Sequence, residues 1–238
     1  MDIASQSGAT VFVIEPCILW KACSAKEKNK LHRRRAVPDF ARTCSRTEDG
    51  NNYFTTLAIF DSDMLTLQSD GFRSKLATAG FNITDHSDLA VRAGKTTHLL
   101  IRKKRAVIHV VVFFQRNFFL QIHALPSVSY GISQTDLRFG RDDAAFENIT
   151  LTLRRLNGKT VLIPTENLRF LFEIKHSKFL ECRFDLAEKH NKKYPLTGEP
   201  LVDLIGTLQA IRNVTYHTLL PVWMDGGSLI GWARHCGG

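Results

Sequence analysis

Long hydrophobic runs are missing from this sequence. The longest apolar stretches, residues 11–20 and 106–114, are each interrupted by polar residues. Neither approaches the roughly 18–20 apolar residues that a membrane-spanning helix needs. Residues 1–5 also lack the basic and then apolar regions of a signal peptide. We therefore expect no transmembrane helix within this chain, and any secretory leader or membrane anchor would lie outside it.

Paired cysteines and excess acidic charge are also lacking. The five cysteines contain no Cys-x-x-Cys spacing of the kind that structural zinc sites use, and an odd number cannot all pair within one chain. Lys+Arg 32 against Asp+Glu 23 leaves a net charge of +9, which favours acidic surfaces or phosphorylated ligands as partners. A hydrophobic content of 44% nevertheless indicates a globular protein with a buried core.

Much of the basic charge lies in residues 21–50. Large apolar residues are few there, and no aromatic residues alternate with the basic ones to stack on bases. We interpret the segment as a solvated basic loop rather than a nuclear-import or phosphate-binding patch, and we expect no nucleic-acid partner.

Three Asn-x-Ser/Thr sequons begin at Asn82, Asn148 and Asn213. About one would be expected by chance, and an occupied sequon marks a surface site of a protein that enters the secretory pathway. The number of sequons favours that pathway.

Hydrophobic patterning predicts an N-terminal domain of the α/β or α+β class over residues 1–150. Strands at 10–14 and 57–60 are each followed by an acidic residue and a helical turn, residues 72–79 favour a helix, and a run of strands follows at 97–101, 107–114 and 118–123. The stretch 107–114 is apolar apart from His109, as expected for a central strand covered on both faces. We interpret His109 and His123 as hydrogen-bonded structural residues.

Residues 151–200 are expected to form a linker subdomain. Strands at 149–153 and 160–163 flank an Asn157-Gly158 turn, a helix is predicted at 166–176, a strand at 177–182 and a short helix at 184–190. Apolar residues then recur at spacings of three and four over 199–218, which predicts an amphipathic packing helix.

The C-terminal segment carries the most specific motif. Val222–Met224 has the pattern of a short strand and runs through Gly226-Gly227-Ser228 into a helical pattern, a layout that often binds nucleotide phosphate at the helix amides. The wider string Pro-Val-Trp-Met-Asp-Gly-Gly-Ser-Leu-Ile-Gly-Trp-Ala-Arg-His-Cys-Gly resembles the entry motif of the LicD/fukutin family of nucleotidyltransferase-fold phosphotransferases. Upstream residues are similar to the fukutin-like members in particular, especially the nematode-type ones.

The resemblance implies roles for individual residues. Gly227 and Ser228 match the family's donor-phosphate-binding pair, and Arg234 matches a phosphate or ion-pair contact. Three further positions match packing residues of the motif: Trp223, Gly231 and Trp232.

The resemblance also implies an activity. A polyol phosphate, such as ribitol phosphate, or a similar group would pass from a CDP-activated donor to a protein-linked glycan acceptor. Mg²⁺ or Mn²⁺, held by paired aspartates, would assist the transfer. The expected location is the luminal side of the Golgi or endoplasmic reticulum, with a membrane anchor outside this chain.

The sequence departs from the family pattern at its end. The family's metal-binding Asp-x-Asp lies roughly a dozen residues beyond the Gly-Ser pair, whereas Gly238 stands ten residues after Ser228. We therefore expect residues 201–238 to be the incomplete start of a nucleotidyltransferase-like domain, with no metal ligands. On this expectation the chain is an inactive fragment of a transferase.

Two other functions are compatible with the residues. Asp61-Ser62-Asp63 follows a predicted strand and has the Asp-x-Asp form with which glycosyltransferases hold a metal-bound nucleotide sugar, although Asp and Ser at this place would also cap a helix. Alternatively, the chain is a non-catalytic module that binds a glycan or a partner protein.

Overall fold

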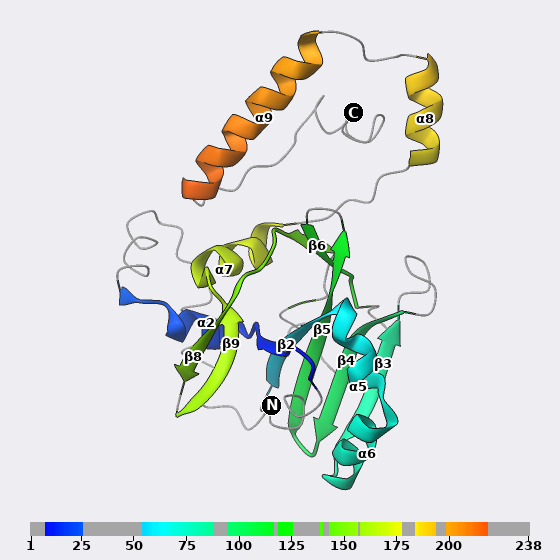
Figure 1. Ribbon diagram of the computed structural model, residues 1–238, viewed down its shortest axis with the longest axis vertical. Helices are drawn as coiled ribbons and strands as arrows, with labels where there is room; N and C mark the ends of the chain where they lie inside the picture. The colour runs from blue at the N-terminus through cyan, green and yellow to red at the C-terminus, as the bar shows by residue number, and fades with distance from the viewer. Residues whose placement is uncertain are drawn as a thin grey trace. The chain divides into compact units, whose positions relative to one another are not determined.

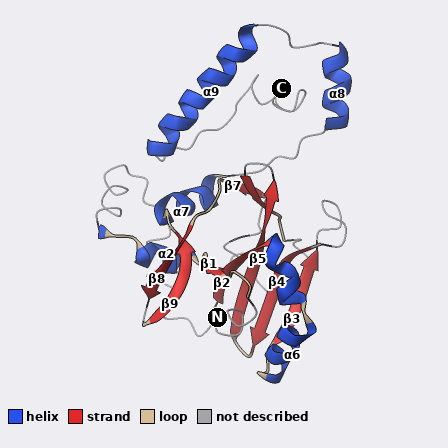
Figure 2. Ribbon diagram, in the orientation of Figure 1, coloured by secondary structure: helices blue, strands red, loops and turns tan. Residues whose placement is uncertain are grey.

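The computed structural model describes residues 8–25, 54–87, 95–116, 119–125, 139, 143–156, 158–177, 184–193 and 199–218. The chain divides into two units, Met1–Phe179 and Leu180–Gly238. Their elements are labelled in Figure 1 and coloured by type in Figure 2, and mixed helix and sheet confirms the predicted α+β class.

The first unit is built on a mixed seven-stranded sheet with the order β1-β2-β5-β4-β3, to which β6 and β7 add beyond β5. Only β2 and β5 run parallel, and the other neighbours are antiparallel. The strands are β1 (Phe12–Val13), β2 (Phe54–Phe60), β3 (Asn82–Ser87), β4 (Thr96–Lys103), β5 (Ala106–Arg116), β6 (Phe119–Ile122) and β7 (Ala144–Phe146).

Strand β5 is central, as the apolar run at 107–114 predicts. It lies between β2 and β4, and its residues from His109 to Phe114 are all buried. β-Branched residues fill much of it because they pack well on a pleated surface that is covered on both sides. Lys104 lies in the β4–β5 turn, with a φ of 53°.

One face of the sheet is covered by short helices. The 3₁₀ turn η2 (Asp61–Asp63) leads from β2 into α5 (Met64–Gln68), and α6 (Asp70–Thr78) follows and confirms the helix predicted there. These helices are drawn in cyan in Figure 1. Their buried side chains join one apolar core with alternate residues of β2, β4 and β5: Ile59, Met64, Leu67, Phe72, Leu76, Leu99, Ile101, Val110, Val112 and Phe114.

Phenylalanines fill much of the opposite face. Phe113 of β5 lies 5.9 Å from Phe12, 5.3 Å from Phe146 and 6.4 Å from Phe170, measured between ring centroids. Phe170 belongs to α7 (Asn167–His176), so this helix supplies the cover on that side. Aromatic pairs at such separations add stability beyond the area they bury.

The predicted hairpin of β8 (Leu151–Leu156) and β9 (Lys159–Pro164) is present, with Gly158 at a φ of 78° in its turn. A positive φ suits glycine because no Cβ opposes it. The hairpin and α7 belong to the first unit, since β9 packs against β1, and α7 packs against α2 (Pro16–Ala22).

In the second unit the structure describes two helices, α8 (Phe184–Lys193) and α9 (Glu199–Thr218). The range of α9 is the one that the apolar spacing predicts. Its Leu208 and Ile211 are 53% and 40% exposed, so these members of the predicted packing stripe are not buried. Among the described residues, no helix is long and apolar enough to cross a membrane.

Sequence patterning missed β3 and β7. Strand β3 reads Asn-Ile-Thr-Asp-His-Ser, which is mostly polar because it lies at the sheet edge with only His86 fully buried. Strand β7 has only three residues, too few to show alternation. The strand predicted at 177–182 falls largely outside the described residues.

Candidate functional site

The predicted donor-phosphate site lies outside the described residues. This applies to Gly227, Ser228 and Arg234 and equally to the packing residues of the motif, Trp223, Gly231 and Trp232. Their roles stay predictions that rest on the resemblance.

Asp61 and Asp63 occupy η2, at the C-terminal end of β2. The Oδ2 atom of Asp63 accepts a hydrogen bond of 3.1 Å from the backbone amide of Thr10. Neither η2 nor α5 receives a side-chain cap, although Asp63 stands at the N-cap position of α5. The helix-capping interpretation of Asp63 is therefore wrong, and its carboxylate instead fixes the chain that enters β1.

The described residues do not fit a divalent metal. No group of three or more His, Cys, Asp or Glu side chains among them is arranged to hold an ion. Because Mg²⁺ and Mn²⁺ prefer several oxygen ligands, the metal that the resemblance implies finds no ligand set in this part of the chain.

The most unusual feature of the described structure is a row of buried polar side chains on the phenylalanine-lined face of the sheet. Strand register opposes His86 to His98, and places His109 diagonally from His98, opposite Leu100. The exposed fractions of His86, His98 and His109 are 3%, 0% and 0%. We refer to these three residues as the histidine row.

The row continues into β2 and the start of α2. Thr56 is the β2 partner of His109 in the parallel ladder. Its backbone amide and hydroxyl both donate to Oε2 of Glu15, over 3.1 and 3.0 Å. Glu15 is 7% exposed, so these charge-assisted bonds satisfy a carboxylate that would otherwise be costly to bury.

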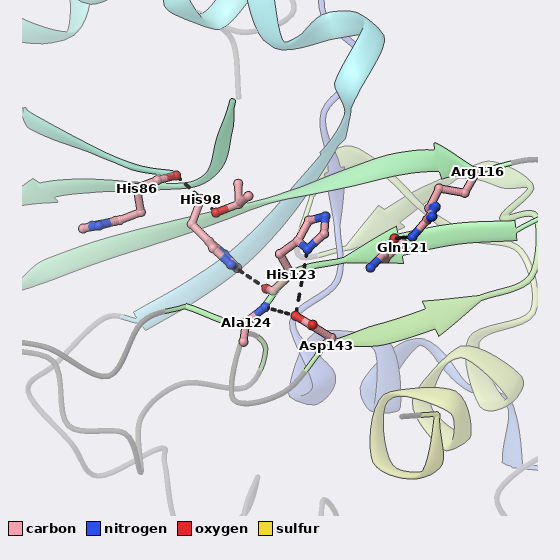
Figure 3. Close-up of polar contacts among 8 residues, drawn as sticks. His86, His98, Arg116, Gln121, His123, Ala124 and Asp143 are labelled. Atoms are coloured by element: carbon pink, nitrogen blue, oxygen red, sulfur yellow. Dashed lines mark hydrogen bonds and ion pairs between the residues drawn. The ribbon is translucent and has the colours of Figure 1, made fainter. Parts of the chain in front are cut away.

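Hydrogen bonds join His98 to His109 and define the protonation of these two rings. Nε2 of His98 lies 2.8 Å from the carbonyl oxygen of His123, and Nδ1 of His98 lies 3.0 Å from Nε2 of His109. A carbonyl only accepts, so His98 carries its proton on Nε2. Nδ1 of the neutral ring then accepts, and His109 donates from Nε2. Figure 3 shows the His98 ring directed at the His123 carbonyl.

Burial keeps the row neutral at physiological pH. It lowers the pKa of His98 to about 4, against the opposing effect of the bond to the His123 carbonyl. The pKa of His109 is lowered well below its usual value by burial and by the neighbouring His98. Burial and then Arg102 lower the pKa of His86 as well. Neutral imidazoles with such low pKa values are poor general bases near pH 7.

His123 extends the network towards β7. Its Nδ1 lies 3.9 Å from Oδ1 of Asp143, and the same oxygen accepts a 2.6 Å hydrogen bond from the backbone amide of Ala124. His123 is 1% exposed, which confirms that it and His109 are buried histidines, with His109 hydrogen-bonded within the sheet. The Asp143 contacts hold the chain at the end of β6 (Figure 3).

The sequence pattern did not single out His86 and His98. His98 lies in Thr-Thr-His-Leu-Leu-Ile, an apolar strand in which a polar residue signals a buried partner, and that signal alone could have marked it. The partner depends on register between strands, which the pattern of one strand does not define.

Two features bear on the compartment of the protein. Of the two cysteines in the described ranges, Cys17 is disulfide-bonded, whereas Cys23 is free and buried. The sequon residues Asn82, Asn148 and Asn213 are all exposed.

Comparison with known proteins identifies the family. The Fukutin N-terminal family matches residues 1–199. The chain is 27% identical over 151 residues to the human ribitol-5-phosphate transferase FKTN, covering 58% of this chain and 32% of the relative. The mouse protein of the same name is 28% identical over 152 residues, covering 59% and 32%.

This chain therefore spans about a third of the length of these curated relatives. No solved structure matches it. Because the family match extends over most of the sequence, from residue 1 to residue 199, the chain belongs to the Fukutin N-terminal family.

Proposed function

We propose that this chain is part of a glycan-modifying phosphotransferase, which passes ribitol phosphate or a similar polyol phosphate from a CDP-activated donor to a protein-linked glycan. The match to the Fukutin N-terminal family carries the proposal, because curated relatives of the chain are named ribitol-5-phosphate transferases. The net charge of +9 supports it, since donor diphosphates are anionic.

Within this protein, the described part of the first unit acts as a non-catalytic domain. The histidine row is fully buried and neutral, so it neither meets a substrate nor exchanges protons readily near pH 7. Asp63 is hydrogen-bonded to the Thr10 amide, and the described residues hold no metal-binding group. We assign donor binding instead to Gly227, Ser228 and Arg234, on the strength of the sequence motif.

The proposed location is the lumen of the Golgi or endoplasmic reticulum. Disulfides persist in oxidising compartments and are rare in the cytosol, and Cys17 is disulfide-bonded. The exposed sequons agree with the same compartment.

Titration calorimetry of the full chain with CDP, with and without Mn²⁺, tests the donor site. We expect Ser228→Ala and Arg234→Gln each to weaken CDP binding by about tenfold, as removal of one hydrogen bond to a phosphate does. Asp61→Asn and Asp63→Asn are the matched controls, and we expect both to bind CDP as the parent chain does. At position 63 asparagine keeps an oxygen that can accept from the Thr10 amide.

The same titrations separate the alternatives. Loss of binding in Asp61→Asn and Asp63→Asn, with Ser228→Ala unaffected, would favour a glycosyltransferase that holds its nucleotide at these aspartates. Absence of CDP binding by the parent chain would overturn the donor site and favour a glycan- or partner-binding module.

A further inference from the structure

The three sequons differ in the structure that surrounds them. An N-glycan is attached to the side-chain amide of Asn, in a segment that the transferase must bind in an extended form and whose Ser or Thr hydroxyl it must reach. All three asparagines are exposed. Exposure therefore does not distinguish the three sequons, whereas the secondary structure of their backbone does.

Two sequons lie inside regular structure. Asn82 begins β3, and the residues of this sequon are paired with β4 through Asn82–Arg102, Ile83–Ile101 and Thr84–Leu100. Asn213 lies within α9, where its backbone follows the helix. Either backbone would have to leave its strand or helix before a glycosylating enzyme could bind the sequon in the folded protein.

Asn148 lies in a loop. Residues 147–150 connect β7 to β8 with no helix or strand, and both Asn148 and Thr150 are exposed. No side-chain hydrogen bond has to break for Asn148 to be reached, since neither its amide nor the Thr150 hydroxyl is hydrogen-bonded in the described structure.

The two ends of this loop are held by Arg169 of α7 and by Thr165, which lies just before that helix. Oε2 of Glu147 forms an ion pair of 2.7 Å with Nη2 of Arg169, and Nε of the same arginine contacts Oε1 of Glu173 over 2.9 Å. The carbonyl of Thr150 accepts a 2.8 Å hydrogen bond from the amide of Thr165. These contacts hold the loop against the unit while Asn148, between them, remains at the surface.

We propose that Asn148 is the principal N-glycosylation site of this protein. The proposal rests on the luminal location given under the proposed function. The side-chain nitrogen of Asn148 forms a bond to the anomeric carbon of a polyprenyl-diphosphate-linked oligosaccharide and releases a proton. The bond from that carbon to the diphosphate oxygen breaks, and the lipid diphosphate leaves with the electron pair.

The experiment expresses the full chain behind a cleavable signal sequence in cultured animal cells, and measures site occupancy by mass spectrometry after peptide-N-glycosidase treatment. The added signal delivers the chain to the lumen whatever its natural location, so failure at Asn148 is distinguishable from failure of the proposed function. We expect Asn148 to be the most highly occupied of the three sites.

Sequon variants provide matched controls. Asn148→Gln and Thr150→Ala should remove most of the glycosidase-sensitive shift on a gel, whereas Thr150→Ser keeps a functional sequon and should retain it. Asn82→Gln and Asn213→Gln should leave the shift largely in place. Occupancy at Asn148 below that of either other site, or a shift that persists in Asn148→Gln, would overturn the proposal.

Discussion

At the residue scale, neutral imidazoles replace apolar side chains in the middle of a sheet. His98 and His109 stack with ring centroids 5.1 Å apart and share a hydrogen bond. Burial without such partners would cost several kcal/mol for each polar ring. The second ring nitrogen of His98, Nε2, is satisfied by its hydrogen bond to the His123 carbonyl. The histidine row stabilises the fold only while its imidazoles are uncharged.

Acid is expected to destabilise the fold through the buried histidines. The folded-state pKa of His98, about 4, lies below its unfolded value of 6.5, so the unfolded chain binds more protons between these pH values. Stability is therefore full above pH 6.5 and falls as pH drops towards 4, by about 3 kcal/mol for this residue. His109 adds to the loss in the same direction.

His98→Gln checks this with urea unfolding followed by circular dichroism. Glutamine keeps a donor for the His123 carbonyl but cannot titrate, so we expect a shallower fall between pH 6.5 and 4, with a cost of about 1–3 kcal/mol at pH 7.5 from the acceptor that His109 loses. The exposed His176 serves as a control, and His176→Gln should follow the parent curve. An unchanged slope in His98→Gln would contradict the assignment.

At the element scale, β1 is a two-residue strand that is lengthened by other groups. The amide of Ile14 donates to the Thr56 carbonyl over 3.2 Å. Oε2 of Glu15 then takes the place of a backbone acceptor for the Thr56 amide. A side chain thus continues the β1–β2 ladder to the point where α2 begins.

We predict that Glu15→Ala lowers the free energy of unfolding by about 2–3 kcal/mol, because two buried Thr56 donors lose their acceptor. Glu15→Gln should cost less, since its carbonyl oxygen still accepts. Asp85 forms an ion pair with Arg73 at the surface, so Asp85→Asn should change stability by less than about 1 kcal/mol. Urea unfolding gives all three values, and equal losses for Glu15→Ala and Asp85→Asn would contradict this account.

At the scale of the whole molecule, the redox state of the cysteines connects the fold with the compartment in which the protein resides. Cys17 lies in α2, which packs against α7, and is disulfide-bonded. Cys23, at the end of the same helix, is free, and its thiol donates to the Leu19 carbonyl over 3.3 Å. Two cysteines six residues apart therefore differ in redox state.

We expect alkylation of denatured, unreduced protein from an oxidising compartment to label Cys23 and to spare Cys17 until a reductant is added. Peptide mass spectrometry reads both sites in one sample, so Cys23 is the internal control. Cys17→Ser should lower stability by about 2–5 kcal/mol, in the range of native disulfides. Labelling of Cys17 without reductant would contradict the disulfide and weaken the luminal assignment.

Local sequence patterns were enough to predict several elements of the fold. The apolar run around His109 marks the central strand, Gly158 marks the β8–β9 turn, and the apolar spacing marks α9. Each of these signals arises from side-chain periodicity or backbone conformation within a few neighbouring residues. The motif around Gly227 and Ser228 also belongs here, since it supplies the donor-site prediction without any tertiary information.

Contacts between distant residues depend on how the strands assemble. The bond of Thr56 to Glu15 spans 41 positions and that of His98 to the His123 carbonyl spans 25. Such partners are selected by strand order and register, and a shift of one residue would turn His98 to the opposite face. The histidine row therefore arises from the pairing of β3, β4 and β5, because burial and hydrogen bonding are properties of the assembled sheet.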